Sequence, residues 1–225
     1  MNKYKNYGQL IVISGPSGSG KGTIVKKLMD ETDHNLWLSI SCTSRKPRGK
    51  EKDGVEYYFL SEEEFEEKIQ ADEFLEYAKY ADNYYGTLKS SIKEKLEKGI
   101  DVILEIEIQG ALKIKEKLPE TIFIFILPPT MRELKKRLET RNTETKDKIL
   151  KRFQRAYSEL NEITKYNYVV INDDIDLATK KIDSILLSEK CRVDRIEETY
   201  LSSLEEEIHE ILREDKEFIN EEIEI

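Results

Sequence analysis

The chain has 225 residues, of which 38% are hydrophobic and 37% are charged, and its formal net charge is −9. This length suffices for one sizeable core, and the charge does not favour nucleic-acid binding through a broad basic surface. The acidic excess lies at one end, because residues 189–225 hold fourteen acidic and five basic residues and so account for the whole net charge. We therefore expect one domain at 1–188 and an acidic helical C-terminal extension at 189–225.

Cysteine and histidine are scarce in the sequence. Two residues of each type supply neither a disulfide framework nor a zinc site. The longest strongly apolar stretch, residues 122–127, is too short to span a bilayer, and the N-terminus has no apolar signal core. These features predict a protein without membrane association, in a reducing cytoplasmic location.

Apolar runs of strand length alternate with helical patterns along the chain. The expected strands are 10–13, 102–106, 122–127 and 168–171. The expected helices are 23–31, 91–98, 111–118 and 145–165. Continuous apolar strands of this kind are typical of buried parallel sheets. The alternation therefore predicts an α/β fold in which a parallel sheet is flanked by helices, with its core formed by residues 1–38, 91–127 and 154–188.

Two segments interrupt this alternation. Residues 39–90 combine aromatic-rich strand patterns with a helix opened by Ser61 and Glu64, which predicts an inserted mixed α/β subdomain. Residues 128–153 begin with Thr130 and Glu133 at the spacing of a capping box and carry several arginines. We interpret this second segment as a basic helical lid.

The first expected strand leads directly into Gly15-Pro16-Ser17-Gly18-Ser19-Gly20-Lys21-Gly22-Thr23, and a helical pattern follows. Glycines let successive backbone N–H groups converge on a phosphate, the helix N-terminus adds partial positive charge, and Lys21 can reach the terminal phosphates. We predict a binding site for a nucleoside triphosphate. Gly22 stands where Ser or Thr usually follows the lysine, so we expect magnesium to be held mainly by phosphates and water, without a direct protein ligand.

A second basic motif lies in the expected inserted subdomain. Arg45 and Arg48 are three residues apart and follow a run of hydroxyl side chains, so the two could fork around one phosphate. A solvated basic loop would explain the same residues by themselves. Next to a triphosphate site, the pair indicates an acceptor nucleotide.

Six ordered motifs resemble guanylate kinase across residues 8–188. They are Ser41–Arg48, Asp53–Phe59, Glu73–Tyr77, Asn83–Gly86, Glu105–Gly110 and Asn172–Asp174. The resemblance implies a P-loop kinase core with a GMP-binding subdomain and a lid. It also implies transfer of the γ-phosphoryl group of MgATP to GMP, and to dGMP, within purine nucleotide metabolism.

The resemblance further implies roles for individual residues. The implied catalytic residues are Lys21, Arg45, Arg137, Arg141 and Arg152. The implied GMP-binding residues are Ser41, Arg45, Arg48, Tyr57, Glu76, Tyr85, Thr87 and Glu107. Asn172 would lie on the adenine side of ATP, and Arg132 would be a surface residue. A carboxylate such as Glu76 can accept from the N1–H and the exocyclic amine of guanine, a combination that adenine does not offer.

Glu105 and Glu107 are two residues apart at the end of an expected strand, so their side chains should share one face of the sheet. By the resemblance, Glu105 orders magnesium-bound water and Glu107 approaches guanine. The extension has apolar residues at helical spacing, which fits a helix packed on the core or on a second subunit, while a solvated, partly disordered appendage stays open. We hypothesise that the extension promotes self-association into a homo-oligomer. These apolar residues are Leu201, Leu204, Ile208, Ile211 and Phe218.

Two other functions stay open. A non-catalytic guanylate-kinase-like protein-interaction module would be expected to lack the lysine or the glycine loop, and both are intact here. A related small-acceptor P-loop kinase, such as adenylate kinase or ribose bisphosphate phosphokinase, would lack the pattern of Glu76, Thr87 and the tyrosines.

Overall fold

The computed structural model describes residues 7–80, 82–140, 146–196, 207–211 and 213. The chain divides into two compact units, one of residues 7–182 and one of residues 1–6 with 183–225. Every candidate site residue that the structure describes belongs to the unit of residues 7–182. Among the helices described, none is long and apolar enough to cross a membrane.

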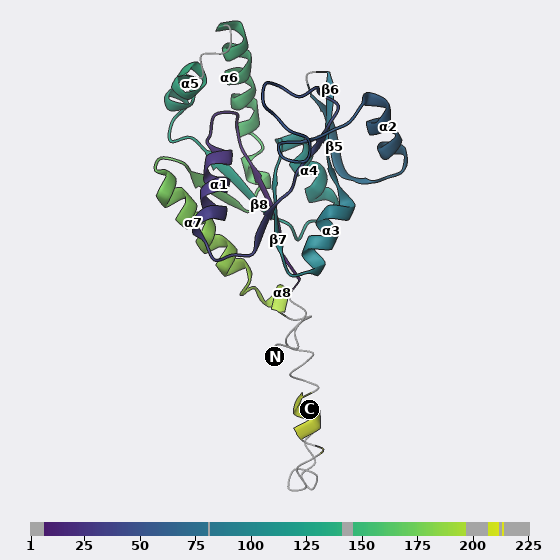
Figure 1. Ribbon diagram of the computed structural model, residues 1–225. Coiled ribbons are helices and arrows are strands. Elements are labelled where there is room, and N and C mark those ends of the chain that lie inside the picture. The colour runs from purple at the N-terminus through teal and green to yellow at the C-terminus, as the bar shows by residue number, and fades with distance from the viewer. Residues whose placement is uncertain (1–6, 81, 141–145, 197–206, 212, 214–225) are drawn as a thin grey trace. The chain divides into compact units, whose positions relative to one another are not determined.

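A five-stranded parallel sheet forms the centre of the first unit (Figure 1). Its strands are β1 (Leu10–Ser14), β2 (Leu36–Leu38), β7 (Asp101–Glu105), β8 (Ile122–Leu127) and β9 (Tyr168–Ile171), in the order β2-β7-β1-β8-β9. Nearly every residue of β1, β7 and β8 is buried, which explains their continuous apolar sequences. This confirms the predicted α/β fold with a parallel sheet. The sequence analysis did not predict β2.

Helices cover both faces of this sheet. They are α1 (Lys21–Glu31), α3 (Lys89–Glu97), α4 (Ile108–Lys117) and α7 (Ile175–Glu189). Figure 1 shows α1 and the first part of α7 on one face, and α3 and α4 on the other. On the latter face, Ile92 of α3 and Ile114 of α4 belong to one buried cluster with Val12 and Leu104 of the sheet. Burial of these side chains fixes α4 against the core, which matters for the site below.

A second, mixed sheet lies within residues 39–90. It contains β3 (Cys42–Thr43), β4 (Tyr58–Phe59), β5 (Phe74–Tyr80) and β6 (Asn83–Leu88), in the order β4-β3-β6-β5. Helix α2 (Glu62–Gln70) packs on this sheet, because its Phe65 ring stacks on Phe74 at a centroid distance of 4.3 Å. The predicted capping box is confirmed, since Ser61 and Glu64 each accept a hydrogen bond from the other's backbone N–H.

Two further helices follow β8, namely α5 (Met131–Thr140) and α6 (Lys146–Leu160). The Glu133 backbone N–H donates to Thr130 Oγ1 at 3.0 Å, as expected for the start of α5. The predicted helix 145–165 ends earlier, because α6 stops at Leu160 and a separate 3-10 turn, η1, covers Ile163–Lys165. The expected lid boundary at residue 153 therefore falls inside a continuous helix.

The second unit contains the end of α7 and the short helix α8 (Val193–Ile196). There, Arg192 and Arg195 both donate to the carboxylate of Glu189. Ile208 and Ile211 are exposed. The other apolar residues of the predicted amphipathic face lie outside the described residues, so self-association of the extension stays a prediction.

Candidate functional site

The loop between β1 and α1 has three glycines with positive φ, and at Gly15 and Gly20 a side chain would also collide with neighbouring segments. Gly15 and Gly20 have φ values of 147° and 93°. A Cβ on Gly15 would lie 2.2 Å from the carbonyl oxygen of Ile126, and a Cβ on Gly20 would lie 2.3 Å from Asn172 Nδ2. The loop therefore packs tightly against neighbouring chain segments with its backbone rather than with side chains.

Helix α1 begins at Lys21 and has no acidic residue in its first turn. Its free N–H groups carry the partial positive charge of the helix N-terminus. The Lys21 side chain folds back over the loop and donates from Nζ to the carbonyl oxygens of Gly15 at 2.6 Å and Pro16 at 3.3 Å. Converging N–H groups beside an ammonium group form a site for a polyanion.

Arginines from both helices of the expected lid reach this loop. From α5, Arg137 Nη2 donates to the backbone oxygen of Asn172 at 3.2 Å, while its Nε donates to Glu133 at 3.1 Å. From α6, the Arg152 guanidinium donates to the Ser17 hydroxyl. Two of the predicted lid arginines thus lie next to the glycine loop. Arg141 falls outside the described residues.

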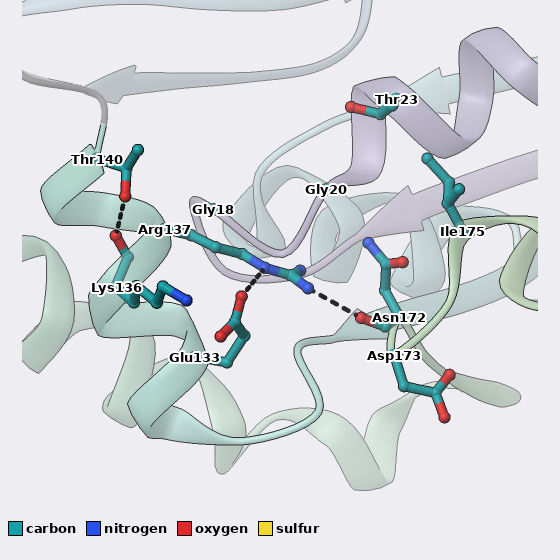
Figure 2. A pocket seen from close by; sticks show the side chains of 10 residues that line it. All are labelled: Gly18, Gly20, Thr23, Glu133, Lys136, Arg137, Thr140, Asn172, Asp173 and Ile175. Atoms are coloured by element: carbon teal, nitrogen blue, oxygen red, sulfur yellow. Dashed lines mark hydrogen bonds and ion pairs between the residues drawn. The ribbon is translucent and has the colours of Figure 1, made fainter.

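A pocket of about 540 Å³ lies beside the loop. Figure 2 shows the Arg137 side chain extending from α5 across this pocket toward Asn172. Asn172 is buried, and its Nδ2 donates to the carbonyl oxygen of Ser19 at 2.7 Å. The residues that line the pocket are Gly18, Gly20, Thr23, Glu133, Lys136, Arg137, Thr140, Asn172, Asp173 and Ile175. The pocket thus adjoins both the glycine loop and α5.

Glu105 and Glu107 point to different partners. Glu105 ends β7, and its carboxylate oxygens lie 3.4 and 3.6 Å from where a Cβ on Gly22 would be. Part of the Glu105 side chain is accessible to solvent. Desolvation of its carboxyl by the surrounding protein nevertheless raises the pKa of Glu105, and the charge of Lys21 opposes that rise. Glu107 does not share a sheet face with Glu105, because it is the N-cap residue of α4, and its carboxylate pairs with Arg155 of α6 at 2.9 Å.

A second cationic cluster occupies the mixed sheet. The Arg45 guanidinium donates two hydrogen bonds to the Glu51 carboxylate, at 2.9 and 3.0 Å. This contact, together with a side-chain hydrogen bond involving Tyr85, raises the pKa of Arg45 above its ordinary value. Arg48 is exposed, but its backbone N–H donates to the same Glu51 carboxylate at 2.7 Å. One carboxylate therefore organises the whole double-arginine loop.

Aromatic rings border this cluster. The Tyr57 and Tyr85 rings meet edge to face at 5.9 Å, and the Arg45 guanidinium lies 5.3 Å from the centre of the Tyr57 ring. Burial raises the pKa of Tyr57, so its phenol keeps its proton and can donate it in a hydrogen bond. The structure thus brings together three of the predicted phosphate-binding residues.

Glu76 is a buried carboxylate on β5. Only 6% of the residue is exposed, and its Oε1 accepts from the Thr87 hydroxyl of β6 at 2.8 Å. Burial raises the pKa of Glu76, while the hydrogen bond from Thr87 and the charges of Lys113 and Lys117 lower it. Such a carboxylate is costly to bury unless it meets further donors. Ser41, also predicted for this site, is half-buried and precedes β3.

Helix α4 supports the strand that carries Glu76. Lys117 Nζ donates to the backbone oxygen of Leu75 at 3.0 Å, and Lys113 donates to that of Tyr77. These lysines satisfy carbonyl groups along β5, which is the last strand in the order of the mixed sheet. The core helix α4 is thereby fastened to the second sheet beside Glu76.

Sequence reasoning did not single out Glu51, Gly110 or the two lysines of α4. A partial signal existed for Glu51, because an acidic residue three positions after Arg48 is well placed to accept from the backbone of such a loop. The lysines and Gly110 gave no local signal, since their contacts are made with residues more than thirty positions away.

Comparison with known proteins adds independent information. Residues 7–189 match the protein family described as guanylate kinase. The chain is 58% identical over 204 residues to a guanylate kinase of Caldanaerobacter subterraneus subsp. tengcongensis, covering 91% of this chain and 98% of that protein. It is 55% identical over 214 residues to a guanylate kinase of Clostridium perfringens (strain SM101 / Type A), covering 94% and 99%.

A solved structure leads to the same family. The crystal structure of guanylate kinase from Anaplasma phagocytophilum matches with a TM-score of 0.71 and 32% identity. The match covers 86% of this chain and 92% of that chain. The similarity therefore extends through the core, the mixed sheet, α5 and α6, and is not confined to the glycine loop.

Proposed function

Because the chain belongs to the guanylate kinase family and is therefore an ATP:GMP phosphotransferase, we propose that the glycine loop holds ATP and the mixed sheet holds GMP. The observation that carries this division of roles is the buried Glu76–Thr87 pair, which suits a purine base. The pair lies in the mixed sheet, whereas the loop follows β1 of the parallel sheet. The core thus supplies the donor site and the inserted subdomain the acceptor site.

On the donor side, the loop N–H groups and the N-terminus of α1 bind the phosphates of ATP. Lys21 exchanges its contacts with Gly15 and Pro16 for the terminal phosphates. The adjoining pocket takes the adenosine part, with Asn172 in its wall. Arg137 and Arg152, together with Arg141, neutralise the negative charge that is shared by the transferring phosphoryl group.

On the acceptor side, Arg45 and Arg48 bind the phosphate of GMP, and the phenols of Tyr57 and Tyr85 donate further hydrogen bonds. Glu51 supports this role because its two-point contact fixes the Arg45 guanidinium plane before a phosphate arrives. The pair of tyrosines excludes water from one side of the cluster, which strengthens charge-assisted bonds there.

Glu76 reads the guanine base with Thr87 and Ser41. The ionised carboxylate accepts from N1–H and the exocyclic amine, and a hydroxyl can donate to O6. Because Glu76 is buried, an adenine in this position would present an acceptor at N1 where guanine presents N1–H, and the unmatched carboxylate oxygen costs about 1 to 3 kcal/mol or more. Glu107 pairs with Arg155, and in the proposed role it stays near the base from its place at the start of α4.

The residues near Gly22 fit a Mg²⁺ ion that arrives with ATP. Mg²⁺ prefers oxygen donors, and the Glu105 carboxylate and the Thr23 hydroxyl at the loop would hold the ion through its bound water. Among the residues described, no three acidic, histidine or cysteine side chains are grouped to hold a metal ion. When bound as MgATP, the ion supplies charge neutralisation on the phosphates. Glu105 orients water in its shell.

Transfer needs alignment more than proton chemistry. The attacking oxygen belongs to the GMP phosphate and is already anionic, so a general base is not required. Arg45 orients that oxygen toward the γ-phosphoryl group, and the lid arginines neutralise the charge between the two nucleotides. Formation of GDP corresponds to a role in purine nucleotide metabolism. We also propose a cytoplasmic location.

The two alternative functions are less well supported. The intact glycine loop with Lys21 speaks against a non-catalytic interaction module. The buried carboxylate of Glu76 argues against adenylate kinase and ribose bisphosphate phosphokinase, because their acceptors do not present the paired N1–H and exocyclic amine of guanine.

A coupled assay of ADP release with MgATP and each of GMP, dGMP, AMP and UMP tests the proposed acceptor. We expect GMP and dGMP to be phosphorylated, because the proposed contacts reach only the base and the phosphate. AMP and UMP should be slower by about three orders of magnitude or more in kcat/KM. Comparable turnover of AMP and GMP would overturn the guanine site, and absence of turnover with every acceptor would favour the interaction module.

The extension carries a separate proposal, that it promotes self-association. Truncation after Lys190 followed by light scattering tests it. The full-length chain should be an oligomer and the truncated chain should contain fewer subunits. An unchanged number of subunits would rule the role out.

A further inference from the structure

Gly110 lies in the first turn of α4, where its missing side chain faces Glu76. A Cβ built on Gly110 would lie 2.6 Å from Glu76 Oε2 and 3.1 Å from Glu76 Cδ. Both distances are shorter than ordinary contacts between carbon and these atoms. Gly110 is buried and sits in a helix, where glycine is otherwise an unfavourable residue. Its place therefore requires an explanation outside the helix.

The helix itself cannot easily retreat from β5. Ala111 and Ile114 of α4 are fully buried against the core sheet, and Lys113 and Lys117 hold the backbone of β5. The Glu76 carboxylate, by contrast, is the far end of a flexible side chain. A methyl group on Gly110 would therefore be accommodated by movement of the carboxylate, while the fold around it stays in place.

We propose that Gly110 is a specificity-determining positioning residue, which acts by leaving the space that the Glu76 carboxylate fills. In this position one carboxylate oxygen accepts from Thr87, and the other occupies the space that a Cβ on residue 110 would need. The donor edge of guanine then meets a carboxylate with a single orientation. This inference rests on the guanine role of Glu76 proposed above.

The central test is a comparison of Gly110→Ala with wild type. We expect the KM for GMP to rise about tenfold or more, because a displaced carboxylate no longer matches the guanine donors. The KM for ATP should change less than about twofold, since the donor site lies at the glycine loop. Thermal unfolding should stay close to wild type, because alanine favours helix and the carboxylate can move. Gln109→Ala, at an exposed position of the same helix turn, is the matched control and should leave both KM values unchanged.

A double-mutant cycle separates action through Glu76 from a general structural effect. In the Glu76→Ala background the carboxylate is gone, so adding Gly110→Ala should change the KM for GMP less than about twofold. An equal rise in both backgrounds would overturn the inference. A KM for GMP unchanged in Gly110→Ala but raised in Glu76→Ala would overturn the positioning role of Gly110 and leave the guanine role of Glu76 standing. A KM unchanged in Glu76→Ala would overturn the guanine role and the inference with it.

Discussion

The Arg45 guanidinium and the Glu51 carboxylate form a two-point ion pair, with N–O distances of 2.9 and 3.0 Å, at the centre of the proposed GMP-phosphate site. The Arg45 side chain is only 9% exposed. The same carboxylate accepts from the backbone of Arg48. Glu51 therefore sets the orientation of one arginine side chain and the loop conformation that carries the other.

Replacing Glu51 with alanine should weaken GMP binding, even though it removes a negative charge near a phosphate site. The loss of orientation outweighs the gain in charge, because a guanidinium fork binds phosphate well only in a fixed plane. We expect the KM for GMP to rise about tenfold, with the KM for ATP unchanged, in steady-state assays. Glu56→Ala, at an exposed position of the following turn, is the control. Tighter GMP binding in Glu51→Ala would show that charge, and not orientation, dominates.

Local pattern was enough to predict the glycine loop together with the strand before it and the helix after it. The glycine run, the buried strand before it and the helix after it are neighbours in the sequence, so their physical roles can be read together. The same holds for the capping box of Ser61 and Glu64. The strand β2 was missed because its apolar run, Leu36–Leu38, is only three residues long and too short for a strand signal.

The support of the acceptor half depends on contacts between distant segments. Nothing near Gly110 in the sequence announces a carboxylate from residue 76, and nothing near Lys117 announces the backbone of Leu75. Both contacts arise because α4 packs between the core sheet and β5. Glu105 and Glu107 diverge for a local reason, since β7 ends at Glu105 and Glu107 is already the N-cap of α4, with only Ile106 between them.

Lys21→Ala should abolish turnover and leave the fold intact. Lys21 is only partly buried, and its ammonium donates to the carbonyl oxygens of Gly15 and Pro16 in its own loop. Its removal takes no apolar side chain out of the core, so we expect the variant to fold. Phosphoryl transfer, by contrast, depends on charge neutralisation at the terminal phosphates, and we expect kcat to fall by about three orders of magnitude. Circular dichroism and the ADP-release assay check the two halves of this prediction. Near-normal phosphorylation of GMP by the variant would rule out the proposed donor site.

Arg137→Ala should lower kcat far more than Arg132→Ala, although both residues belong to α5. Arg137 reaches the backbone of Asn172 beside the glycine loop, whereas Arg132 is exposed. Removal of one charge that stabilises a transition state costs about a hundredfold in kcat. The KM for GMP should change little, because α5 does not carry the acceptor site. Equal effects of the two substitutions would show that the overall charge of the lid, and not the position of Arg137, matters.

The buried carboxyl of Glu76 should make stability depend on pH in a defined direction. Burial raises the pKa of Glu76 above its ordinary value near 4.5, while Thr87 of β6 and Lys113 and Lys117 of α4 oppose the rise. In the window between the ordinary and the raised pKa, the folded protein holds a proton that the unfolded chain has released. The contribution of Glu76 to folding is therefore fully present below the ordinary pKa and is lost as the pH rises through the raised value.

Glu76→Gln keeps the acceptor for Thr87 and has no charge to bury, so it should be more stable than wild type at pH 7. This advantage should shrink as the pH falls toward 4.5. Chemical denaturation of both proteins from pH 4.5 to 8 measures it. Stability is the cleaner readout, because the phosphate of GMP itself titrates near pH 6. An advantage that grows toward acidic pH would contradict the raised pKa.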